Sequence, residues 1–193
     1  SDWSHDSRSV RALLAEAIEP YADGDIDVHV EVGEHEGAEP ADRRNPAILY
    51  GLGNLIENAV DFARTKVEVR VSWTAENVVV EIVDDGPGFA PEVIDRIGEP
   101  YVTTRGHRGK QEEVPDAEAG GLGLGFFIAK TFLERSGAGL RLANRAAPES
   151  GAIVRITWPR AVYGNRKRNP PAEKFGTDEQ AAYMSDNTAK NAE

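Results

Sequence analysis

The sequence predicts an α/β fold, because segments with helical periodicity alternate with segments that have the two-residue period of strands. One helix is expected from Pro46 to about Ala63, where apolar residues recur at helical spacing: Ile48, Leu52, Leu55, Ile56, Ala59, Phe62 and Ala63. Residues 67–73 alternate between apolar and polar, and residues 78–83 are mostly apolar. With a turn at 75–77, these two segments predict a strand pair.

The other predicted elements are shorter. Residues 10–18 form an amphipathic helical pattern, and residues 26–32 are typical of an edge strand. Residues 140–144 and 152–158 are expected to close the sheet. Asn45 is a suitable cap before Pro46, whose fixed backbone angle suits the first turn of a helix.

Composition indicates one packed domain. Of its 193 residues, 40% are hydrophobic, which is enough to form one core. A chain of this length is too short for two domains of ordinary size. We expect a residual linker at residues 1–9, the domain at 10–160 and a disordered polar tail at 161–193. The formal net charge of −11 argues against nucleic acid or an anionic membrane surface as a partner.

The absence of cysteine excludes a disulfide framework and fits a cytoplasmic location. The sequence contains neither a bilayer-spanning apolar run nor a signal-peptide pattern. Any membrane anchor is therefore expected to precede Ser1.

Two amides on the long helix form the first candidate site. Asn54 and Asn58 lie four residues apart and so share a helix face, with Glu57 and Asp61 beside them. Such a face is often simply solvated. The functional alternative is that the Asn58 carbonyl oxygen binds Mg²⁺, which prefers hard oxygen ligands and is commonly shared with phosphates.

Two glycine-rich motifs follow. Asp84 ends the second predicted strand and precedes Gly86 and Gly88, so its carboxylate could accept a hydrogen bond from an exocyclic amine such as that of adenine. An ordinary turn would use the same residue types. Further on, glycines alternate in a run that opens a helix and offers backbone N–H groups to an anion: Gly121, Leu122, Gly123, Leu124 and Gly125. The spacing is neither that of a Rossmann fingerprint nor that of a Walker A loop.

A polar segment at 106–119 separates these motifs, and long loops of this kind are usually lids or disordered. Between two candidate phosphate-binding segments, we expect a nucleotide lid.

In this order the motifs resemble the ATP-binding catalytic domain of bacterial sensor histidine kinases, which belongs to the GHKL superfamily of gyrase, Hsp90 and MutL. Asn54–Asn58 resembles the N box, Asp84–Gly88 the G1 box, Pro100–Arg105 the F box and Gly121–Gly125 the G2 box. The resemblance covers roughly residues 8–160. Residues 97–105 and 127–138 are most similar to the redox-responsive RegB/PrrB/ActS group. The fold implied is the Bergerat ATP-binding fold, a two-layer α/β sandwich with a mixed sheet covered by helices on one face.

The resemblance also implies roles for individual residues. Asn58 would bind Mg²⁺ and Asp84 the adenine amine, while Glu57 would polarise the attacking group and Arg105 would contact the γ-phosphate. The remaining implied nucleotide contacts are Asn54, Phe62, Gly86, Gly88, Tyr101, Thr103, Thr104 and Gly121–Gly125 with Leu122 and Leu124. Asp61 departs from the family, because many relatives have a phosphate-contacting lysine there.

The implied reaction is transfer of the ATP γ-phosphoryl group to a histidine on a dimerisation domain, and then to a response regulator. None of the four histidines has the helical pattern of an acceptor, so we expect all four to be solvent-exposed and residues 1–9 to continue from a dimerisation hairpin. The full-length protein would then be a homodimer in the bacterial inner membrane, with this domain in the cytoplasm. Two alternatives are an anti-sigma-type serine kinase and a non-catalytic domain that holds nucleotide.

Overall fold

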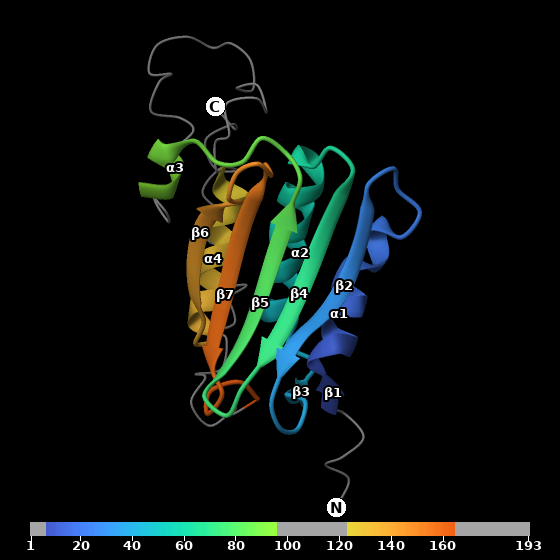
Figure 1. Cartoon of the computed structure of the whole chain (residues 1–193). Coiled ribbons are helices and arrows are strands. Elements are labelled where there is room, and N and C mark those ends of the chain that lie inside the picture. The colour runs from blue at the N-terminus through green and yellow to red at the C-terminus, as the bar shows by residue number, and fades with distance from the viewer. Residues whose placement is uncertain (1–6, 96–122, 165–193) are drawn as a thin grey trace, which may run out of the picture.

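The computed structural model describes residues 7–95 and 123–164. Its main feature is a five-stranded mixed sheet in the order β2-β4-β5-β7-β6, and helices α1, α2 and α4 lie on one face of it (Figure 1). The strands are β2 (Asp27–His35), β4 (Lys66–Trp73), β5 (Asn77–Asp84), β6 (Gly139–Asn144) and β7 (Ala152–Pro159). This confirms the predicted two-layer α/β architecture.

Strand β2 pairs with β4 in parallel, and the other pairings are antiparallel. The expected strand pair 67–73 and 78–83 is confirmed as β4 and β5, and β2 is an edge strand, as its sequence indicated. Strands β4, β5 and β7 alternate buried and less buried residues, so every second side chain joins the core beneath the helices.

Helix α2 (Pro46–Phe62) is the central helix of the covering layer. The predicted cap is confirmed, because the Asn45 side chain accepts hydrogen bonds from the backbone N–H groups of Ala47 and Ile48. The other helices are α1 (Val10–Ile18), the 3₁₀ turn η1 (Glu19–Tyr21), α3 (Pro91–Asp95) and α4 (Leu124–Arg135). Leu52, Leu55 and Ile56 of α2 are almost completely buried, and burial of this apolar face stabilises the layer against the sheet.

A two-stranded sheet of β1 (Ser7–Ser9) and β3 (Ala41–Arg43) lies at the end of the domain where the described chain begins. Beyond the predicted boundary at residue 160 the chain still packs on the core. Tyr163 is 9% exposed and lies edge-on to Trp158 at a ring-centroid distance of 5.5 Å. The packed domain therefore includes the residues up to Tyr163.

Candidate nucleotide-binding site

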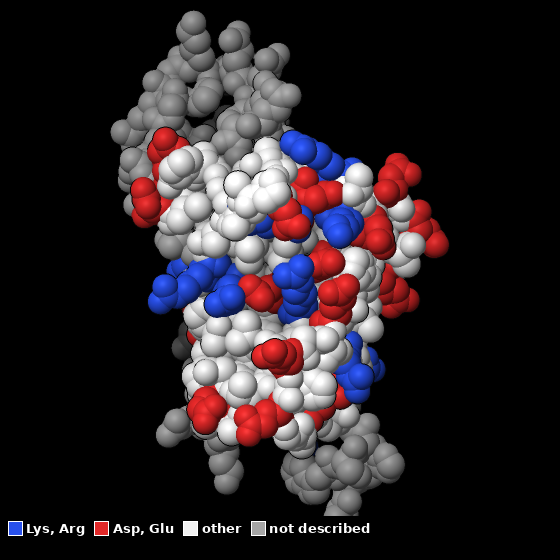
Figure 2. Space-filling model, viewed as in Figure 1, with Lys and Arg blue, Asp and Glu red and all other residues white. Residues whose placement is uncertain are grey.

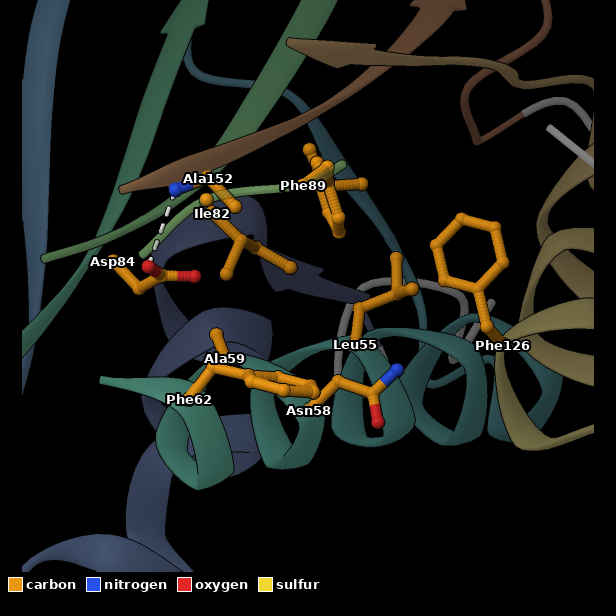
Figure 3. Close-up of a pocket in the computed structure, with 11 residues that line it drawn as sticks. Leu55, Asn58, Ala59, Phe62, Ile82, Asp84, Phe89, Phe126 and Ala152 are labelled. Carbon is orange, nitrogen blue, oxygen red and sulfur yellow. Dashed lines mark hydrogen bonds between the residues drawn. The ribbon is translucent and has the colours of Figure 1, made fainter. Parts of the chain in front are cut away.

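A pocket opens between α2, the start of α4 and the ends of β5 and β7 (Figure 3). Most of its lining is apolar, and two polar side chains, those of Asn58 and Asp84, reach it. Its lining residues are Leu55, Asn58, Ala59, Phe62, Ile82, Asp84, Gly88, Phe89, Phe126, Ala152 and Val154. Apolar walls with few polar groups suit a flat heteroaromatic ligand that those groups orient.

Asp84 is held rigidly in this pocket. The residue is 5% exposed, and its Oδ1 accepts hydrogen bonds from the backbone N–H groups of Gly86 at 2.8 Å and Ala152 at 3.1 Å. The second carboxylate oxygen points into the pocket in Figure 3. Burial raises the pKa of the Asp84 carboxyl above its usual value, although the two N–H groups act in the opposite direction. The arrangement leaves one hydrogen-bond acceptor facing the ligand space.

The glycines next to Asp84 are required by close packing. A Cβ atom on Gly86 would lie 2.3 Å from the carbonyl oxygen of Phe62, and one on Gly151 would lie 1.9 Å from the carbonyl oxygen of Asp84. Gly88 has a φ of +85°, a conformation that glycine adopts without strain. These contacts bring the end of α2 and the start of β7 against the end of β5, so the pocket wall has little freedom.

Asp85, the next residue, does not line the pocket and links the same turn to the start of β4. Its carboxylate accepts hydrogen bonds from the N–H groups of Arg64, Thr65 and Lys66 and from the hydroxyl of Thr65. Burial alone would raise its pKa, but these hydrogen bonds outweigh burial and lower the pKa to about 2. Asp84 thus faces the pocket, whereas Asp85 has a structural role.

The predicted residues of α2 separate into two groups. Asn58 and Phe62 line the pocket, whereas Glu57 is exposed and Asn54 donates a hydrogen bond from Nδ2 to the carbonyl oxygen of Tyr50 at 3.0 Å. The pKa of the Tyr21 phenol is raised, first by burial and then by the nearby Glu57 and Asp61 carboxylates. The suggested roles of Glu57 and Asn54 remain predictions.

Helix α4 begins inside the second glycine motif. Gly123 is its N-terminal cap and makes no side-chain cap hydrogen bond, and Leu124 is 59% exposed. The first turn of a helix has N–H groups without intrahelical partners, and its dipole favours an anion. Tyr101, Thr103, Thr104, Arg105, Gly121 and Leu122, together with the expected lid at 106–119, lie outside the described residues.

Several pocket residues were not predicted from the sequence. Phe89 and Phe126 directly follow glycine motifs, so their position could have indicated a wall of the site. Ala152 and Val154 carry no such signal, because only the pairing of β7 with β5 brings them beside Asp84 and Ile82.

The two histidines in the described residues differ in exposure and in their neighbours. His35 is exposed, as expected, and stacks against Trp73. His29 contradicts the expectation, because its side chain is only 34% exposed and lies near three carboxylates. His5 and His107 lie outside the described residues. In the described part of the chain, no helix is both long and apolar enough to cross a bilayer.

Comparison with known proteins agrees with this geometry. Residues 45–162 match the family described as histidine kinase-, DNA gyrase B-, and HSP90-like ATPase. Sensor histidine kinase RegB of Cereibacter sphaeroides is 43% identical over 159 residues, which are 76% of this chain and 34% of RegB. Sensor histidine kinase CpxA of Escherichia coli K12 is 34% identical over 92 residues, 47% of this chain and 19% of CpxA. The chain thus spans about a third of the length of RegB.

Solved structures share the fold. The mycobacterial sensor histidine kinase MprB superimposes with a TM-score of 0.59 at 21% identity, covering 79% of this chain and 97% of that chain. The catalytic domain of histidine kinase ThkA gives a TM-score of 0.58 at 20% identity, covering 80% and 95%.

Proposed function

The chain belongs to the histidine kinase-, DNA gyrase B- and HSP90-like ATPase family, and we propose that it is the ATP-binding catalytic domain of a RegB-like sensor histidine kinase. In this role it donates the γ-phosphoryl group of ATP to a histidine on a separate dimerisation domain. A response regulator then receives the phosphoryl group. The observation that carries the proposal is the buried Asp84 carboxylate, with one oxygen fixed by Gly86 and Ala152 and the other directed into an apolar pocket.

The pocket supports adenine as the base. A carboxylate accepts hydrogen bonds only, so Asp84 suits the exocyclic amine of adenine and repels the carbonyl oxygen that guanine carries at the same ring position. The rings of Phe62 and Phe89 and the side chain of Ile82 provide apolar contact area for the base. Gly88 keeps the wall free of a side chain.

The other end of the pocket suits a triphosphate. Asn58 reaches the pocket from α2, and its amide oxygen is a hard ligand of the kind that Mg²⁺ takes in small numbers together with phosphates and water. The uncapped first turn of α4 offers N–H groups to phosphate oxygens. A bound Mg²⁺ would neutralise phosphate charge. Arg105 is proposed as an additional cation for the γ-phosphate, since a guanidinium matches phosphate geometry.

Phosphoryl transfer depends mainly on positioning and charge stabilisation, so the domain needs no nucleophile of its own. The acceptor histidine, homodimerisation and attachment to the bacterial inner membrane would come from other segments of a longer kinase. The described domain would then lie on the cytoplasmic side of that membrane, where ATP and the response regulator are available.

The proposal is tested by supplying the acceptor. The full 193-residue chain is incubated with Mg²⁺ and γ-labelled ATP, alone and with a separately produced dimerisation domain from a RegB-type kinase. We expect no label on the chain alone and acid-labile phosphohistidine on the added domain. Asn58→Ala should abolish the labelling. Asn77→Ala is the matched control, because Asn77 begins β5 at the end of that strand opposite Asp84.

The alternatives give different results. Acid-stable phosphoserine on a partner protein would support the anti-sigma-type kinase instead. ATP binding without transfer to any acceptor histidine would support a domain that only holds nucleotide.

A further inference from the structure

The face of the sheet away from the helices has a cluster of ionisable groups at its β2 edge. His29 and Glu31 are on β2, and the parallel pairing of β2 with β4 places His29 beside Glu68. Residues two apart on a strand point to the same face, so all three side chains share the helix-free face. This face carries charged side chains of both signs (Figure 2).

The three side chains converge at the distances expected of metal ligands. His29 Nε2 lies 3.3 Å from Glu31 Oε1 and 3.6 Å from Glu68 Oε1, and one ligand atom from each residue lies within 4.8 Å of the others. Zinc bonds to nitrogen and oxygen are about 2.0–2.2 Å long, and tetrahedral ligands at that radius are roughly 3.3–3.6 Å apart. The two separations from His29 match this range, and the two carboxylate oxygens, which lie within 4.8 Å of each other, would move closer together around a bound ion.

A neighbouring arginine orients the Glu68 side chain. Arg70 Nε and Nη2 both donate to Glu68 Oε2, at 2.9 and 2.5 Å, which fixes the carboxylate with Oε1 toward His29. On the other side of the imidazole, His29 Nδ1 lies 3.6 Å from Asp27 Oδ2. This separation is longer than a hydrogen bond, so Asp27 adds negative charge beside the ring without fixing its orientation.

The local charge also favours a cation. Three carboxylates, those of Asp27, Glu31 and Glu68, face two basic side chains, Lys66 and Arg70. Lys66 Nζ is 3.8 Å from Glu68 Oε1, and its side chain is 46% exposed. A side chain so exposed gains little from an ion pair and can turn into solvent when an ion takes its place.

We propose that His29, Glu31 and Glu68 form a binding site for a divalent transition-metal ion such as Zn²⁺, with water completing the coordination. An imidazole ligand favours Zn²⁺ over Mg²⁺ and Ca²⁺, which prefer oxygen ligands alone. The site lies on the opposite face of the sheet from the nucleotide pocket and is independent of it. By joining β2 to β4, the ion would stabilise the edge strand.

The test is calorimetric titration of the full nucleotide-free chain with zinc chloride in the presence of excess Mg²⁺. We expect one Zn²⁺ to bind per chain and the melting temperature to rise, because the ion binds the folded state. His29→Gln and Glu68→Gln should each weaken binding at least about tenfold. His35→Gln is the matched control, since His35 is an exposed histidine on the same strand.

Circular dichroism on each variant confirms that the fold is retained, and His29→Asn provides a second histidine variant with a smaller side chain. Absence of Zn²⁺ binding by the parent chain would show that the cluster forms ion pairs only. If His35→Gln and His29→Gln lost the same amount of Zn²⁺ affinity, the ion would bind at another place. Either result would overturn the proposal.

Discussion

Asn144 holds the backbone of Phe89 through two hydrogen bonds, although the residues lie 55 positions apart. Asn144 Oδ1 accepts from the Phe89 N–H at 2.7 Å, and Nδ2 donates to the Phe89 carbonyl oxygen at 2.8 Å. Asn144 ends β6, and Phe89 lines the pocket just after the turn that contains Asp84. The edge strand thus positions one wall of the proposed nucleotide site, although Asn144 itself does not line the pocket.

We predict that Asn144→Ala weakens ADP binding by up to about tenfold, because Phe89 loses two hydrogen bonds worth roughly 1 kcal/mol each or less at an exposed position. Calorimetric titration with ADP measures the change. Asn144→Asp has nearly the same shape but places a carboxylate oxygen against the Phe89 carbonyl. It should bind ADP at least as weakly as Asn144→Ala, and parent-like affinity in this variant would mean that side-chain shape alone matters.

The parent chain should bind ADP more tightly than GDP, since Asp84 offers an acceptor to the base. Asp84→Asn should weaken ADP binding by roughly tenfold to a hundredfold and reduce the preference, because an amide is an uncharged and poorer acceptor. Competition titrations with the two nucleotides measure both effects. Equal affinity of the parent for ADP and GDP would remove Asp84 from the base-binding site.

Asp84→Asn should leave the stability at neutral pH unchanged or higher. A carboxyl whose pKa is raised by folding destabilises the folded state above that pKa, and this cost disappears as the pH falls through it. The asparagine variant carries no such cost and keeps an oxygen for the N–H groups of Gly86 and Ala152. Urea unfolding at neutral pH compares the two. A clear loss of stability in the variant would show that the ionised carboxylate stabilises the fold.

Asp85 should have the opposite pH dependence. Its pKa is lowered to about 2 in the folded state from an ordinary value of 3.8, so its contribution is complete above about pH 4 and is lost as the pH falls toward 2. Asp85→Asn should therefore lower the free energy of unfolding at neutral pH, and the difference from the parent should shrink in acid. Urea unfolding across this range tests the prediction, and a deficit that is independent of pH would contradict it.

Two glycines of α2 should respond differently to alanine. A Cβ atom on Gly51 would lie 2.8 Å from Leu133 Cγ of α4, whereas one on Gly53 would have no neighbour within 4 Å. Gly53→Ala should stabilise the protein by about 0.5–1 kcal/mol through helix propensity. Gly51→Ala should destabilise it by roughly 1–3 kcal/mol through overpacking. The midpoints of urea unfolding measure the stability change in both variants. A more stable Gly51→Ala variant would show that α2 and α4 can move apart slightly without loss of stability.

The sequence predicted the main helices and strands, because their signals are local, but it did not predict the short elements β1, β3 and α3. Apolar spacing placed α1 and α2, alternation placed β4, a mostly apolar run placed β5, and the side chain of Asn45 marked the start of α2. Gly86 and Gly88 were predicted to lie against a ligand, and that role stays a prediction. The structure adds that glycine is needed at position 86 because a Cβ atom there would meet the backbone of Phe62. Asn58, Phe62, Asp84 and Gly88 were predicted as site residues, and all four line the pocket.

Sequence by itself determined which segments form helices and strands and which motifs carry polar groups, because those properties depend on residues close together in the chain. Tertiary structure decided how these groups are used. Pairing of β7 with β5 brings Ala152 to Asp84 and leaves one carboxylate oxygen for the ligand. Packing of α2 separates the pocket-lining Asn58 from the exposed Glu57, although the two are adjacent in sequence. The parallel register of β2 and β4 places Glu68 beside His29, and contacts of this kind depend on strand order and packing, which no local pattern specifies.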